Sequence, residues 1–281
     1  MMRISVFIEI IQIVYTIPTT LLMILTIFVI MKEIRRKNNY FNRQFYLIIV
    51  CKLINDIAYV LTKVIFFKLP KLGYFHAFLL KNNWVAAMYS VLTTMQTTLI
   101  YLMTLLISLN RYIALKYPIT YKYYFSTSNM TQLLIFCTLL STLTGIGTAF
   151  YPSTYGIQLV AGYFMPFYTN RKVFYYLVVN TIILYGVIFF GTCVFNVLAI
   201  VELIKHKKLC INSNKNKRES MHIIYSIFVF ITLAFIEAFF IFRILGMVLD
   251  SAFFEALGQF LLIWVFDITS IGDFYFLIFI R

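Results

Sequence analysis

Charged residues are scarce in this chain of 281 residues, and acidic residues are the scarcest of them. Asp, Glu, Lys and Arg together make up 12% of the chain, and only 10 residues are acidic. A soluble globular protein has roughly 25% charged residues, whereas here 62% of the residues are hydrophobic and 19% are aromatic. Because water could not solvate such a surface, the composition excludes a soluble enzyme, a disordered chain and a secreted disulfide scaffold. It predicts an integral membrane protein.

Cysteine and histidine are also rare, with four and three residues. No spacing of His, Cys, Asp and Glu is typical of a metal site, and the four cysteines imply no disulfide. The sequence contains no nucleophile–base pair and no phosphate-binding loop. We therefore expect no metal, no cofactor and no enzymatic activity.

Long apolar runs dominate what the chain does contain. A helix needs roughly 20 mostly apolar residues to cross a bilayer. Seven runs have about this length, and they cover 5–31, 45–67, 85–110, 133–151, 174–201, 221–247 and 256–280. A membrane β-barrel would instead show alternating strands of about ten residues. The sequence predicts an all-α membrane protein in which residues 1–281 form a single seven-helix transmembrane domain.

The basic residues between these runs predict the orientation of the bundle. With the N-terminus outside, the loops on the cytoplasmic side carry 15 Lys and Arg and the outer loops carry six, Lys68 and Lys71 among them. Cytoplasmic loops hold the excess of positive charge in most membrane proteins. We therefore expect the N-terminus outside and the C-terminus inside. The net charge of +14 is explained by these loops, so we expect contact with the lipid bilayer and not with nucleic acid.

The third run, 85–110, carries a polar stripe and ends in a basic motif. Residues spaced by three or four share one face of a helix, and here they are Thr93 or Thr94, Thr97, Tyr101, Thr104 and Ser108. On a helix in lipid such a stripe should face the interior of the bundle. At its cytoplasmic end stand Asn110, Arg111 and Tyr112, followed by Pro118. Arg111 either reaches across the bundle to neighbouring helices or only extends toward the membrane surface.

Two acidic residues, Asp56 and Asp267, lie near the middle of the second and seventh runs. Ionisable groups at this depth are costly, so they should face the interior and have partners. Lys52 precedes Asp56 by four residues and can pair with it on one helical face. Either these residues, with Ser270 nearby, form a buried network that only fixes the packing, or they form a switch.

Polar residues in the outer halves of the helices are candidates for ligand contact. They are Gln96, Thr97, Tyr101, Asn180, Glu237 and Arg243. Glu237 and Arg243 are six residues apart and lie on different faces, so they cannot simply neutralise each other. Ordinary hydrogen bonding between helices is an equally good explanation for each residue. The 30 Phe and 21 Tyr would line a cavity with apolar surface suited to a small ligand.

Several of these segments resemble known receptors. Residues 110–118 are similar to the Asp-Arg-Tyr motif of rhodopsin-like G-protein-coupled receptors, with a proline seven residues after the arginine. The wider chain resembles the nematode serpentine chemoreceptors of the Srg superfamily, and within it the Srv group. The matching positions are 15–19, 41–46, Asp56, 110–112, 118–121, Asp267 and Ser270.

The resemblance implies a rhodopsin-like bundle with named roles. Arg111 would hold the resting state and contact the G protein, Tyr112 would support it, and Pro118 would shape the second inner loop. Asp56 would be a switch or a sodium-type site. The chain departs from the pattern at Asn110, which cannot neutralise an arginine, and at Asp273, which follows Gly272 where receptors have a proline motif.

The resemblance also implies a function. It is that of a chemoreceptor that binds a small external chemical within the bundle and signals to a heterotrimeric G protein. The expected location is the plasma membrane, in a sensory cilium. Two alternatives stay open: a seven-helix transporter or channel that uses Lys52, Asp56 and Asp267, and a partner subunit without signalling of its own.

Overall fold

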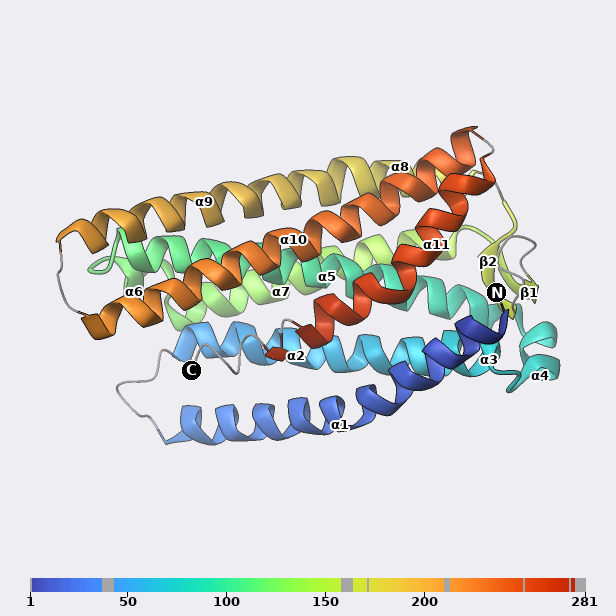
Figure 1. Ribbon diagram of the computed structural model, residues 1–281, viewed down its shortest axis with the longest axis horizontal. Helices are drawn as coiled ribbons and strands as arrows, with labels where there is room; N and C mark the ends of the chain where they lie inside the picture. Colours follow the sequence, from blue (N-terminus) through green and yellow to red (C-terminus); the bar gives the residue numbers. More distant parts are fainter. Residues whose placement is uncertain are drawn as a thin grey trace.

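Long helices lie side by side in the computed structural model, with one small β-hairpin at one end (Figure 1). The structure describes residues 2–36, 43–157, 164–170, 172–209, 213–249, 251–272 and 274–275.

The first half of the chain is almost entirely helical. It forms α1 (Met2–Arg35), α2 (Arg43–Lys63), the π-helical segment η1 (Val64–Lys68), α3 (Leu69–Lys71), α4 (His76–Lys81), α5 (Asn83–Lys116) and α6 (Tyr121–Tyr124). The second half adds α7 (Thr127–Ala149), β1 (Ser153–Ile157), β2 (Phe164–Tyr168), α8 (Val173–Val178), η2 (Val179–Tyr185), α9 (Gly186–Leu209), α10 (Ser213–Leu249), α11 (Ala252–Asp267) and η3 (Ile268–Gly272). The segments η2 and η3 are π-helical, like η1.

Six helices in the described part of the chain are long and apolar enough to cross a membrane. They are Ile10–Arg35, Gln44–Lys71, Asn83–Lys116, Thr127–Ala149, Val173–Lys205 and Ile227–Leu249. Each overlaps one of the first six predicted runs. The seventh predicted run coincides with α11, which has 16 residues, and with η3 after it. Because 276–280 lie outside the described residues, the count of seven stays a prediction.

Most of the predicted runs were shorter than the helices that the structure shows. The third run was expected to end at 110, yet α5 continues to Lys116, and the second continues through η1 and α3 to Lys71. The fourth was expected over 133–151, but α7 begins at Thr127, where Ser126 Oγ accepts a hydrogen bond from the backbone N–H of Asn129. The predicted runs end where polar and basic residues begin. Such residues are compatible with a helix that continues beyond the bilayer.

The helix α5 is the central element of the bundle. It packs against α2, α7 and α9, and its buried side chains form the largest apolar core with those of α7, α9 and α10. Small residues let these helices approach closely, as is common in membrane bundles. At Gly145 of α7, an added Cβ would lie 2.8 Å from the carbonyl oxygen of Val91 in α5.

The two ends of the bundle differ. At one end, which we call the hairpin end, lie the start of α1, the helices α3 and α4, and the β1–β2 hairpin (Figure 1). The hairpin is antiparallel, with Ser153 opposite Tyr168 and Ile157 opposite Phe164. At the other end, the α6 end, α6 lies beside the ends of α5 and α9 (Figure 1). A hairpin was not predicted from the sequence.

Candidate functional site

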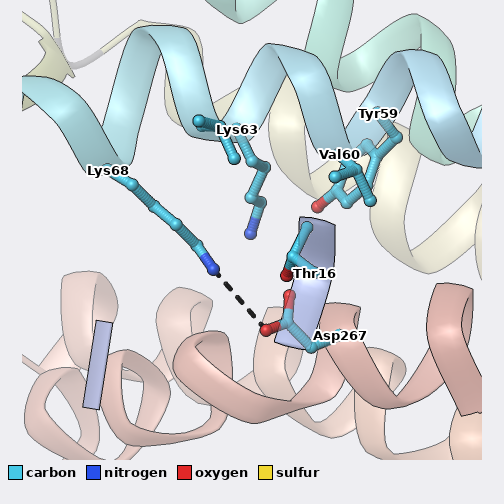
Figure 2. A pocket seen from close by; sticks show the side chains of 7 residues that line it. Thr16, Tyr59, Val60, Lys63, Lys68 and Asp267 are labelled. Carbon is cyan, nitrogen blue, oxygen red and sulfur yellow. Dashed lines mark ion pairs between the residues drawn. The ribbon is translucent and has the colours of Figure 1, made fainter. Parts of the chain in front are cut away.

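A charged cluster joins three helices in the interior of the bundle. Its members are Gln12 and Tyr15 of α1, Lys68 of η1 and Asp267 of α11, and we call it the Lys68–Asp267 cluster. The Lys68 Nζ lies 3.6 Å from Asp267 Oδ2 and donates to Gln12 Oε1 at 3.1 Å. The Tyr15 hydroxyl donates to the same Asp267 oxygen at 2.6 Å. Figure 2 shows Lys68 and Asp267 approaching each other from opposite helices.

The spacing of polar residues on α1 explains why it supplies part of the cluster. Gln12, Thr16 and Thr19 are buried, and Tyr15 lies on the same face, since these positions are three or four residues apart. The Thr19 hydroxyl donates to the carbonyl of Tyr15 at 2.8 Å and lies 3.1 Å from the hydroxyl of Tyr275. The first helix therefore contacts the seventh predicted span twice through polar groups.

The π-helical segment η1 brings Lys68 into the bundle. A π-helical turn holds an extra residue, so the residues after it are rotated relative to a continuous α-helix. Lys68 and Lys71 are buried, although the sequence placed both in an outer loop. That expectation was wrong, because a lysine with a long apolar stem can be buried when its ammonium has a partner. For Lys68 the partners are Asp267 and Gln12.

A small cavity lies beside this cluster (Figure 2). Its volume is about 10 Å³, and its lining residues are Thr16, Tyr59, Val60, Lys63, Val64, Lys68 and Asp267. The Lys63 Nζ lies 5.4 Å from the centre of the Tyr59 ring and 5.9 Å from that of Phe67. A cavity of this size holds about one water molecule, whereas small-molecule sites measure about 300–1,000 Å³. In this state the cavity is therefore too small for an organic ligand.

A second ion pair is buried within α2. The Lys52 Nζ lies 2.9 Å from Asp56 Oδ2, and both side chains are at most 2% exposed. The predicted pairing of these two residues is confirmed. The ammonium supplies the positive charge that Asp56 needs, so the residues here do not call for a sodium ion.

The predicted grouping of Lys52, Asp56, Asp267 and Ser270 is only partly reproduced. Asp267 forms an ion pair with Lys68, and Asp56 forms one with Lys52. Ser270 is buried in η3, and its Oγ has no hydrogen-bond partner among the described residues. Asp56 and Asp267 therefore have different lysine partners in the part of the chain that the structure describes.

The polar stripe on α5 faces the interior, as expected. Thr97, Tyr101, Thr104 and Ser108 are all buried. Gln96 is also buried but turns toward α2, where its Nε2 donates to Thr62 Oγ1 at 3.0 Å. This contact is of the interhelical kind that the sequence left as the alternative to ligand binding.

Two of the candidate ligand residues meet between α5 and α10. The Tyr101 hydroxyl donates to Glu237 Oε2 at 3.0 Å. The Tyr101 ring stacks on that of Tyr185 in η2, with centres 4.7 Å apart and planes at 11°. The Tyr185 hydroxyl lies 2.9 Å from Thr98 Oγ1, and its ring centre is 5.5 Å from that of Phe240. We call Tyr101, Tyr185, Glu237 and Phe240 the central site.

The two remaining ligand candidates, Asn180 and Arg243, lie outside the central site. Asn180 is buried in η2, five residues before Tyr185. Arg243 is exposed on α10. Its separation from Glu237 agrees with the expectation that the two residues occupy different faces.

At the α6 end, Asn110 binds the segment that follows α5. Its Nδ2 donates to the Tyr121 hydroxyl at 2.9 Å, and the Asn110 side chain is buried. Tyr121 stacks on Phe125 with ring centres 5.4 Å apart. Asn110, which stands where the receptor motif has an acidic residue, therefore has a direct structural contact with α6.

The neighbours of Asn110 differ in burial. Arg111 and Tyr112 are half-buried, whereas Pro118 is exposed. The Tyr112 ring centre lies 5.9 Å from that of Phe195 in α9, and its hydroxyl accepts from Lys116 Nζ at 2.7 Å. Tyr112 therefore connects α5 to α9 beside the arginine.

The β1–β2 hairpin is attached to η1 by a hydrogen bond. Among the described residues no disulfide is present, and Cys51, Cys137 and Cys193 are free. The Tyr155 hydroxyl donates to the carbonyl oxygen of Phe66 at 2.9 Å. Burial raises the pKa of Tyr155. The hairpin therefore contacts the segment that carries Lys68, a link for which the sequence offered no signal.

The roles of Gln12, Tyr15 and Lys68 were also missed. Tyr15 was noted only as part of a matching segment, although its spacing from Gln12 and Thr19 predicts a shared polar face. The position of Lys68 depends on the π-helical turn, which no residue in the sequence marks.

One family model matches most of the chain. It describes the Srg family chemoreceptors and matches residues 9–281. No curated protein matches the chain. The matched range contains both charged sites, the central site and the α6 end. The match confirms the Srg resemblance, while the narrower placement in the Srv group stays a prediction.

Proposed function

Because the chain belongs to the Srg family of chemoreceptors, we propose that it binds a small external chemical within its helices and activates a heterotrimeric G protein. The protein is an integral membrane protein with a chemoreceptor role. Our proposal is that the chain acts by binding a ligand and signalling to a G protein, and that it does not act as an enzyme.

The proposed arrangement is a rhodopsin-like bundle of seven helices formed by residues 1–281. The N-terminus and the hairpin end lie outside the cell, and the α6 end and C-terminus lie in the cytoplasm. The distribution of loop Lys and Arg supports this orientation. The proposed location is the plasma membrane, in a sensory cilium.

The observation that carries the proposal is the central site at mid-depth between α5, η2 and α10. The Tyr101–Glu237 hydrogen bond joins α5 to α10 through two residues that are 136 positions apart in the chain. A polar contact of this kind is broken or remade when a ligand enters or the helices move. A ligand that prefers one of the two packings shifts the population toward it.

The Lys68–Asp267 cluster is proposed as the switch that couples α1, η1 and α11. It has several charged or polar bonds, and these bonds must be exchanged if α11 moves relative to η1. Packed interfaces of this type have discrete arrangements and do not deform continuously. The hairpin contacts η1 through Tyr155, so events at the outer surface can reach the cluster.

The α6 end is proposed as the surface that meets the G protein. Ile119 is 93% exposed and Tyr123 78% exposed, and both lie in the segment that follows α5 and Arg111. If the orientation is as proposed, this surface faces the cytoplasm. The bond between Asn110 and Tyr121 holds α6 against α5 in the present state.

The test is G-protein activation in membranes that express the chain, measured against a panel of small odorants. Arg111→Ala should remove the ligand-dependent signal. The matched control is Arg36→Ala, which removes an exposed arginine at the same end of the bundle. A signal that survives Arg111→Ala would contradict the proposed role of this residue. Ion flux in place of G-protein activation would favour a transporter.

A further inference from the structure

Among the acidic side chains that the structure describes, Glu237 is the one without a basic partner in that part of the chain. The structure describes five acidic side chains, and four have a lysine or arginine nitrogen within 3.6 Å: Glu33, Asp56, Glu202 and Asp267. The recorded partner of Glu237 is the neutral hydroxyl of Tyr101. Its basic neighbour on the same helix, Arg243, is exposed and lies six residues away.

A lone carboxylate at this depth is costly. Ionisable groups within a membrane bundle normally pair with each other or line a functional pathway. The chain follows this rule at Asp56 and Asp267, where lysines are buried to provide the pairing. At Glu237 the described residues provide a single hydrogen bond, so the carboxylate remains available to a cation from outside the chain.

The surroundings of Glu237 suit an ammonium group. The rings of Tyr101 and Tyr185 stack beside it, and the Phe240 ring lies next to that of Tyr185. Aromatic faces attract organic cations, and the attraction is stronger in a site from which water is excluded. A carboxylate beside several aromatic rings therefore favours a positively charged amine over a neutral or acidic ligand.

One oxygen of Glu237 lies near a glycine. Oε2 accepts from Tyr101, whereas Oε1 has no hydrogen-bond partner among the described residues. A Cβ added at Gly186, the first residue of α9, would lie 3.8 Å from Oε1. Because glycine has no side chain, nothing from that position covers the oxygen. Glu237 is also partly accessible, unlike the buried Tyr101.

We infer that the ligand of the central site is a small organic amine, whose ammonium binds Glu237 Oε1 and whose apolar body lies against Tyr101, Tyr185 and Phe240. This inference rests on the proposed function, because it names the chemical class of the ligand. It assigns Glu237 as the residue that distinguishes charged from neutral compounds of the same shape.

The test compares amines with alcohols of the same skeleton. The probes are 2-phenylethylamine with 2-phenylethanol, and isoamylamine with isoamyl alcohol, added to the purified receptor in nanodiscs. The readout is thermal unfolding, which reports binding without a G protein. At least one amine is expected to raise the midpoint by about 2–4 °C at a concentration well above its Kd, and its alcohol is not.

Variants identify the residue responsible. Glu237→Gln keeps the shape and removes the charge, so the stabilisation by the amine should be lost. Glu202→Gln is the matched control, because Glu202 is an acid on α9 that already pairs with Lys205. Glu237→Asp keeps the charge with a shorter side chain and should weaken the shift without removing it, which covers the case in which Glu237→Gln fails to fold.

Three results would overturn the inference: equal stabilisation by amine and alcohol, an unchanged amine shift in Glu237→Gln, or no shift with either amine. Failure of the receptor proposal has a different outcome. Stabilisation by an amine without nucleotide exchange would contradict the signalling role and leave the binding site intact.

Discussion

Removing the positive charge of Lys68 should destabilise the bundle, because it leaves Asp267 without its ion-pair partner. Lys68→Met keeps an unbranched side chain of similar reach and removes only the ammonium. Asp267 would retain the hydrogen bond from Tyr15. The complementary variant Asp267→Asn removes the negative charge and leaves Lys68 with Gln12.

The magnitude follows from the geometry of the pair. Two unit charges 3.6 Å apart attract by about 4–5 kcal/mol at an effective dielectric constant near 20. Breaking a buried pair by removing one partner costs about 3–5 kcal/mol in soluble proteins. Since Tyr15 and Gln12 each keep one bond, we expect about 3 kcal/mol for Lys68→Met and about 2 kcal/mol for Asp267→Asn.

The double variant provides the decisive comparison. With both charges absent, no lone charge is buried, and the loss should be about 1–2 kcal/mol. The two changes together should therefore cost about 3–4 kcal/mol less than the sum of the single changes. The assay is equilibrium unfolding of the purified protein in mixed micelles, followed by the change in helix content. Lys81→Met is the matched control, because Lys81 is exposed, and it should change stability by less than about 0.5 kcal/mol.

Additive losses in the double variant would refute this reasoning. They would mean that Lys68 and Asp267 contribute separately to stability, and the cluster could not act as a coupled switch.

Two further predictions concern the hairpin and the contact between α5 and α7. Tyr155→Phe removes the bond to the Phe66 carbonyl, so the hairpin should open more readily by about 1 kcal/mol, seen as faster amide hydrogen exchange in β1 and β2. Tyr123→Phe changes an exposed tyrosine and serves as its control, and equal exchange in the two variants would count against the attachment. Gly145→Ala places a Cβ 2.8 Å from the Val91 carbonyl and should cost about 1–3 kcal/mol of stability. In Gly258→Ala the nearest atom is 3.7 Å from the new Cβ, so a loss as large there would contradict the explanation by close packing.

The sequence predicted the features that depend on composition and helical spacing. The first six apolar runs each correspond to a helix able to span a membrane, because the length of an apolar run directly reflects the thickness of the bilayer. The polar stripe from Thr97 to Ser108 is buried as its period requires. The Lys52–Asp56 pair follows from its spacing of four residues in a helix.

The features that the sequence did not predict depend on local departures from regular helices. Lys68 was expected in an outer loop, and its burial follows from the π-helical turn η1, which changes the register of all residues after it. Asp267 was grouped with Asp56 because both lie near mid-membrane. Depth alone does not decide which helix a side chain faces, and the partner of Asp267 is Lys68.

The sequence indicated Tyr101 and Glu237 as candidate ligand residues, but it could not predict that they contact each other. They lie on helices distant in the chain, and their contact depends on how α10 packs against α5. Gln96 and Arg243 were equally good candidates by residue type. The structure places Gln96 against α2 and leaves Arg243 exposed.

The most direct test of the receptor proposal records two activities of the same protein. The chain is reconstituted into proteoliposomes with a heterotrimeric G protein, and both nucleotide exchange and ion flux are measured while the odorant panel is added. We predict ligand-dependent nucleotide exchange without ion flux, and loss of that exchange in Arg111→Ala. Ligand-dependent flux in the absence of nucleotide exchange would contradict the receptor proposal and identify a transporter or channel.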